Sequence, residues 1–116
     1  MDGALESLTT ALRRFAAERD WEQFHSPKNL ACALTVEAAE LLEHFQWLTE
    51  EQSRNLPEDK RMAVGHELAD VLLYLLQIAD RLQIDLLAAA AQKLELNAAK
   101  YPAARARGTS RKYNEL

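Results

Sequence analysis

Four carboxylates at a repeated spacing are the residues of this chain best suited to chemistry. Glu37 and Glu40 lie three positions apart, and Glu67 and Asp70 repeat that spacing after a gap of 26 residues. On a helix, side chains three positions apart are neighbours, with Cβ atoms about 5–6 Å apart. If the two helices pack antiparallel, the four carboxylates converge, and their mutual repulsion requires a divalent cation. Oxygen ligands of this kind favour Mg²⁺ or Mn²⁺ over Zn²⁺.

The surroundings of Asp70 strengthen the metal interpretation. It is the only charged residue between Glu67 and Asp80, and its neighbours in the sequence are mostly leucine, valine and alanine. A helix this apolar is expected to be buried on most sides. A lone buried carboxylate either takes up a proton or binds a cation, because burial of the free charge costs several kcal/mol.

Apolar residues at helical spacing predict the elements that must position these carboxylates. Helices are expected over residues 2–19, 27–48, 58–82 and 86–101, with a short helical turn over residues 50–56. Ser26 and Asp85 are expected to cap the second and fourth of the long helices. Thr49, with Gln52 three residues later, fits a capping box. The predicted fold is all-α, an antiparallel four-helix bundle, with an irregular chain beyond Pro102.

Two further groups of side chains suit a nucleotide. Flat apolar rings with hydrogen-bonding capacity, which a nucleobase requires, are supplied by Trp21, Phe24, His25, Trp47 and Tyr74. Polar and basic side chains, which phosphate groups require, are Lys93, Asn97 and Lys100 on one stripe of a helix, and Arg111, Lys112 and Tyr113 near the C-terminus. The alternative interpretation places the tryptophans in the core and the basic residues in solvent.

Composition and charge restrict the class of protein and its partners. The chain of 116 residues is 48% hydrophobic and 28% charged, which indicates a single soluble domain over residues 1–116. A net charge of −4 argues against a DNA or RNA partner, while the tail over residues 103–116 carries a net +3 and suits a small polyanion. The longest charge-free run of the third helix, residues 71–79, is shorter than the ~20 residues of a membrane span.

The expected compartment is the cytoplasm, with no membrane partner. The single cysteine, Cys32, has no partner for an internal disulfide, and the first residues lack the basic and apolar segments of an export signal.

The carboxylate pairs and the strings around them resemble the MazG-like superfamily of all-α NTP pyrophosphatases, in particular its dCTP pyrophosphatase branch. The strings are Glu18-Arg-Asp-Trp-Glu-Gln-Phe-His25, Glu43-His-Phe-Gln-Trp47, Asp70-Val-Leu-Leu-Tyr-Leu75 and Ser110-Arg-Lys-Tyr-Asn-Glu-Leu116. The resemblance implies a bundle completed by a second subunit, in a homodimer or homotetramer. It also implies Mg²⁺-dependent cleavage of a nucleoside triphosphate, dCTP or a modified dCTP, between its α and β phosphates to give the monophosphate and pyrophosphate.

The same resemblance gives roles to individual residues. The Mg²⁺ ligands are implied to be Glu37, Glu40, Glu67 and Asp70, and Glu37 or Glu40 is the catalytic residue that orients or deprotonates the attacking water. One position departs from the family pattern, because a pocket histidine of the first helix is replaced by Leu12, and this leaves the base preference open. Two alternatives remain, a pyrophosphohydrolase acting on another nucleotide such as dUTP or phosphoribosyl-ATP, and a non-catalytic helical dimerisation module.

Overall fold

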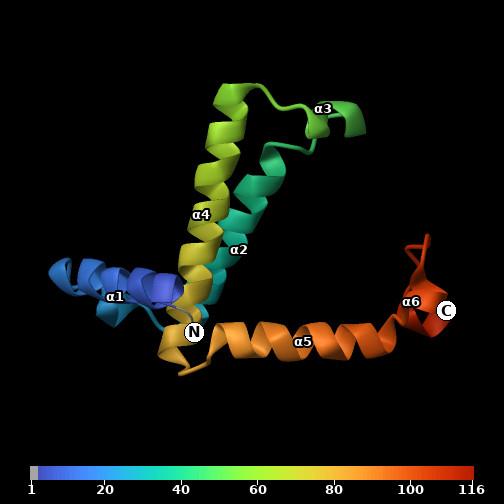
Figure 1. The fold of residues 1–116 in the computed structure, drawn as a ribbon. Coiled ribbons are helices and arrows are strands. Elements are labelled where there is room, and N and C mark those ends of the chain that lie inside the picture. Colours follow the sequence, from blue (N-terminus) through green and yellow to red (C-terminus); the bar gives the residue numbers. More distant parts are fainter. Residues whose placement is uncertain (1–2) are drawn as a thin grey trace. The chain divides into compact units, whose positions relative to one another are not determined.

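Helices joined by short turns and loops make up the described chain. The computed structural model describes residues 3–116 and contains no strand within that range, which confirms the all-α prediction. The helices are α1 (Gly3–Glu18), α2 (Pro27–Glu43), α3 (Glu50–Arg54), α4 (Glu58–Arg81), α5 (Leu86–Lys100) and α6 (Ala103–Ala106) (Figure 1). Two compact units, residues 3–84 and Asp85–Leu116, are described separately below.

The predicted helix starts are confirmed by their capping hydrogen bonds. The Ser26 side chain accepts from the backbone amide three residues on at 3.1 Å, and Asp85 does the same at the start of α5. At α3, the Thr49 hydroxyl accepts from the Gln52 amide at 3.1 Å, while the Gln52 side chain accepts from the Thr49 amide at 2.9 Å. These contacts satisfy amides that would otherwise lack a partner within the helix.

Two of the sequence predictions about the helices are wrong. α2 ends at Glu43 rather than at Leu48, because the chain tightens into turns in which the His44 and Phe45 amides donate to carbonyls three residues back. The chain beyond Pro102 is also more regular than expected, since it forms α6 and a 3₁₀ turn at Tyr113–Glu115. The predicted first helix begins at Asp2, which lies outside the described residues.

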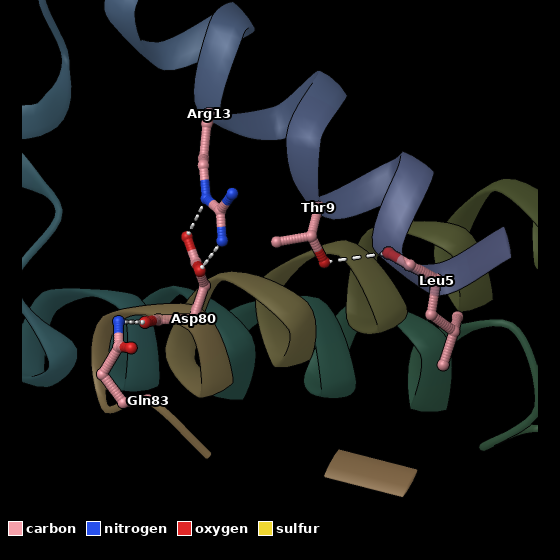
Figure 2. Close-up of polar contacts among 5 residues, drawn as sticks. All are labelled: Leu5, Thr9, Arg13, Asp80 and Gln83. Atoms are coloured by element: carbon pink, nitrogen blue, oxygen red, sulfur yellow. Dashed lines mark hydrogen bonds and ion pairs between the residues drawn. The ribbon is translucent and has the colours of Figure 1, made fainter. Parts of the chain in front are cut away.

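The core of residues 3–84 lies between α2 and α4, which run side by side in opposite directions (Figure 1). Leu30 of α2 and Leu76 of α4 are each only 1% exposed. Helix α1 packs against α4 and buries Ala16 and Thr9. The Thr9 hydroxyl donates to the Leu5 carbonyl at 2.9 Å, so its burial leaves no unsatisfied donor (Figure 2).

A bidentate ion pair links α1 to α4. The Arg13 guanidinium donates from Nε to Asp80 Oδ2 at 2.9 Å and from a terminal nitrogen to Oδ1 at 2.5 Å (Figure 2). Arg13 lowers the pKa of Asp80 by hydrogen bonding to the ionised carboxylate and by its charge. The pair therefore fixes the register of α1 on the C-terminal part of α4.

The expectation that α4 is buried on most sides is wrong for the described chain. Leu68 is 52% exposed and Leu75 is 37% exposed, and Asp70 is also exposed. α1 and α2 cover only part of the circumference of α4. Among the described residues, α4 is the one helix with the length and composition to cross a membrane, a test that core helices of soluble proteins also pass.

Candidate functional site

Three of the predicted carboxylates meet between α2 and α4. Glu37 of α2 and Glu67 and Asp70 of α4 each place a side-chain oxygen within 4.8 Å of the other two. The spacing of three puts Glu67 and Asp70 on one surface of α4, and the antiparallel packing of α2 brings Glu37 to that surface. Glu37 and Glu67 are half-buried, whereas Asp70 is exposed.

The electrostatics of this cluster are unfavourable without a positive partner. Glu37 Oε2 and Glu67 Oε1 are shielded from solvent and have no hydrogen-bond partner among the described residues. The adjacent carboxyls of Glu37 and of Glu40, together with burial, raise the pKa of Glu67 to about 8. The pKa of Glu40 is lowered, first by Glu67 and then by Glu37. The cluster therefore retains a proton at neutral pH.

The donor set of the cluster fits a hard divalent cation. All the converging atoms are carboxylate oxygens, the ligands that Mg²⁺ and Mn²⁺ prefer. The two shielded oxygens without a donor, on Glu37 and Glu67, are the atoms that a cation would satisfy. The carboxyl of Glu40, the fourth predicted ligand, adjoins Glu67 but lies outside the 4.8 Å group.

A cavity of about 400 Å³ opens beside the cluster and shares two of its carboxylates. Five of the predicted site residues line it, namely Trp21, His25, Glu37, Asp70 and Tyr74. Most of the remaining wall is apolar, which suits a flat ring. Burial, Glu37 and Asp70 together raise the pKa of Tyr74, so its hydroxyl stays protonated and able to donate.

A left-handed turn after α1 places Trp21 in this wall. Asp20 has a φ of 53°, a conformation that aspartate tolerates better than most residues. The Trp21 amide then donates back to the Ala16 carbonyl at 2.9 Å, as in a Schellman motif. The Trp21 ring meets Phe15 edge-on, with 5.7 Å between centroids, and His25 with 6.3 Å. The turn therefore folds the indole back over α1.

Two predicted aromatic residues lie outside the cavity lining. Phe24 is 59% exposed in the 3₁₀ turn Glu22–Phe24, and Trp47 is 86% exposed in the turn after α2. Leu12, the position that departs from the resembled family, does line the cavity.

Five cavity-lining residues were not identified from the sequence, namely Leu8, Ala11, Phe15, Leu73 and Gln77. Leu8 and Phe15 follow the apolar stripe of α1, and that stripe predicts a packed face as readily as a pocket wall.

The six predicted phosphate-binding residues belong to the second unit and stay predictions. Lys93, Asn97, Arg111, Lys112 and Tyr113 are exposed there, as is Lys100. The Lys100 ammonium lies 5.0 Å from the centroid of the Tyr113 ring, and Tyr101 meets that ring edge-on at 6.2 Å. Two of the six, one from α5 and one from the tail, are thus adjacent.

Comparisons with known proteins find relatives over nearly the whole chain. A model of the MazG-like family matches residues 32–116. Human dCTP pyrophosphatase 1 is 46% identical over 114 residues, which cover 97% of this chain and 67% of that protein, and the mouse protein is 45% identical over the same share. A solved pyrophosphatase of Archaeoglobus fulgidus is similar with a TM-score of 0.82 at 40% identity, covering 88% of this chain and 95% of that one.

Proposed function

Because this chain belongs to the MazG-like family, we propose that it hydrolyses dCTP or a modified dCTP between the α and β phosphates. The products are the nucleoside monophosphate and pyrophosphate. The observation that carries the proposal is that Glu37 and Asp70 belong both to the carboxylate cluster and to the wall of the aromatic cavity. A nucleotide whose base enters the cavity therefore has its phosphates near the carboxylates.

The residues of the cluster divide the catalytic work. Glu37, Glu40, Glu67 and Asp70 hold the cation, Mg²⁺ or alternatively Mn²⁺. When bound, this ion offsets the negative charge of the triphosphate and of the departing pyrophosphate. Glu40 has a lowered pKa and so stays ionised at neutral pH, where it or Glu37 orients the attacking water and accepts its proton. Catalysis rests mainly on positioning and electrostatics.

The other predicted residues bind the substrate in this proposal. Trp21, His25 and Tyr74 contact the base in the cavity. The phosphate groups are bound by basic and polar residues of the second unit, namely Lys93, Asn97, Lys100, Arg111, Lys112 and Tyr113. Phe24 and Trp47 complete the base site when a second subunit is present.

A second copy of the chain is the proposed cover for the exposed apolar face of α4. Leu68 and Leu75 are exposed there, and Trp47 is 86% exposed in the same unit. Sedimentation should give two or four times the mass of 13.1 kDa, in keeping with a dimer or tetramer. Leu68→Glu, which places a charge on this face, should return the protein to the mass of one chain. A wild-type protein that sediments at 13.1 kDa would contradict the proposal.

A nucleotide panel tests the reaction. The protein is incubated with Mg²⁺ and each of dCTP, dUTP, dTTP, dATP and dGTP, and the products are separated by chromatography. We expect dCMP and pyrophosphate from dCTP as the fastest reaction. Diphosphate with inorganic phosphate would overturn the bond assignment, and faster turnover of another nucleotide would overturn the substrate.

The catalytic assignment is tested by a matched pair of variants on α2. Glu40→Gln removes a cluster carboxylate and should abolish most turnover while the protein stays folded. Glu43→Gln makes the same chemical change at the exposed end of the helix and should leave turnover unchanged. Full activity of Glu40→Gln would contradict the metal and catalytic roles.

The proposed compartment is the cytoplasm, where nucleoside triphosphates are available as substrates. Fluorescence microscopy of the tagged protein tests this, and signal confined to a membrane would contradict it.

A further inference from the structure

Gln77 is a polar residue in the cavity wall that belongs neither to the carboxylate cluster nor to the aromatic residues assigned to the base. It lies on α4, is half-buried, and lines the cavity together with Tyr74, one turn earlier on the same helix. Leu12 of α1 lines the same cavity and offers no hydrogen bond. Gln77 therefore brings an amide to a wall that is otherwise largely apolar.

The orientation of this amide is fixed by a backbone contact. The Gln77 side-chain nitrogen donates to the Leu73 carbonyl at 3.3 Å. If the amide were reversed, its oxygen would face the Leu73 carbonyl, and two acceptors would be in contact. The nitrogen is therefore assigned to the side that faces Leu73, and the oxygen points away from that carbonyl. No hydrogen bond to the side-chain oxygen of Gln77 occurs among the described residues, and Gln77 lines this cavity as well as a smaller one beside Arg13 and Asp80. Gln77 thus presents a hydrogen-bond acceptor.

His25 also lines the cavity, where its ring meets Trp21 edge-on, and three other polar side chains differ from Gln77 in what they offer. Glu37 and Asp70 belong to the carboxylate cluster that the proposed function gives to the cation. Tyr74 keeps its hydroxyl proton and can donate. An acceptor at Gln77 with a donor at Tyr74, on one helix face, complements a heterocycle that carries an amino group beside a ring acceptor.

We propose that Gln77 determines base specificity by accepting a hydrogen bond from the exocyclic amino group of the base, the 4-amino group of cytosine. This inference rests on the proposed function, since it names how that site selects its substrate. Uracil and thymine carry a carbonyl oxygen at this position, which would meet the Gln77 oxygen acceptor to acceptor. Sites that hydrogen-bond a substrate group discriminate against analogues that lack it because a polar partner is left unpaired.

The test compares kcat/KM for dCTP and dUTP in the wild type and in Gln77→Leu, which keeps the approximate volume and removes the acceptor. We expect the preference for dCTP to fall about tenfold. The loss should come from a higher KM for dCTP at unchanged kcat, because the base lies away from the reacting bond. A preference within twofold of the wild-type value would overturn the inference.

A substrate analogue tests the same contact without any mutation. The deoxynucleoside triphosphate of 2-pyrimidinone lacks the 4-amino group and is otherwise the same shape as dCTP. The wild type should prefer dCTP to this analogue about tenfold, and Gln77→Leu should treat the two alike. Equal discrimination by both proteins would overturn the inference even if the variant were less stable.

A control variant and a measurement with dATP complete the test. Gln83→Leu is the matched control, because Gln83 also donates its side-chain amide to a carbonyl of α4 (Asp80, 3.1 Å) but does not line the cavity. It should keep the wild-type preference. If Gln77→Leu weakened turnover of dATP but not of dCTP, Gln77 would recognise the amino group of adenine. The assignment to cytosine would then be wrong. Absence of turnover by the wild type on every nucleotide would instead refute the proposed function.

Discussion

The ion pair between Arg13 and Asp80 is the polar link between α1 and α4, and Asp80→Asn tests its strength. The contact has two points, at 2.9 and 2.5 Å, and the Asp80 side chain is only 21% exposed. Exposed ion pairs contribute about 0.2–1 kcal/mol, and two-point contacts to a half-buried carboxylate lie at or above the upper end. Because Arg13 is 54% exposed and solvent screens the pair, we expect a loss of about 1 kcal/mol.

For a chain of this size, that loss corresponds to a fall in Tm of about 4 °C, measurable by circular dichroism. The sign of the pH dependence follows from the lowered pKa of Asp80. Its stabilisation is present above the ordinary value of 3.8 and is lost as the pH falls through the lower folded value. The Tm difference between wild type and variant should therefore be constant from about pH 5 to 8 and vanish in stronger acid.

A control and an activity measurement sharpen this test. Glu58→Gln removes the exposed pair with Arg61 within α4 (3.5 Å, Glu58 77% exposed) and should change Tm by less than about 1 °C. Because α1 supplies part of the cavity wall, Asp80→Asn should also raise the KM for dCTP more than it lowers kcat. An unchanged Tm, or a Tm difference that does not shrink as the pH falls below 3.8, would refute the reasoning.

Two other predictions concern the carboxylate cluster and the hydrophobic core. Glu67, with a pKa raised to about 8, makes the metal-free protein less stable as the pH rises from 4.5 to about 8, because the folded state holds the proton that the unfolded state has lost. Binding of Mg²⁺ at pH 7 should release about 0.9 proton by calorimetry in two buffers, and almost none at pH 9.5; equal values at both would contradict the pKa. Leu76→Ala should lower the free energy of unfolding by about 2–4 kcal/mol in urea titrations, because Leu76 is 1% exposed. Met62→Ala, on the same helix but 59% exposed, should cost less than about 0.5 kcal/mol, and similar losses for both would contradict this core.

Helix starts could be predicted from the sequence because local chemistry determines them. Ser26, Thr49 and Asp85 cap their helices with side-chain contacts three residues away, so a short window of sequence contains the whole signal. The end of α2 could not be predicted in the same way. No glycine or proline lies between Glu43 and Leu48, and the apolar spacing continues to Leu48, although the chain has already tightened into turns.

The site was predictable where it depends on spacing along one helix, and less so where it depends on packing between helices. Glu67 and Asp70 are neighbours by spacing alone, whereas their approach to Glu37 depends on the register of α2 against α4. Trp21 and Trp47 looked equivalent in the sequence, but only Trp21 is folded back onto α1 by the left-handed Asp20. Gln77 was missed because a single glutamine among leucines carries no pattern.

The residues that line the cavity differ in whether the proposed reaction depends on them. In the proposed function Glu37 and Asp70 hold the cation, so substitutions at these positions should reduce activity whichever base is present. Leu8, Leu12 and Phe15 of α1 also line the cavity and have no role in the proposed chemistry. Selection can therefore reshape α1 to admit new bases while hydrolysis is preserved, and a library restricted to these three positions is a direct route to altered nucleotide preference.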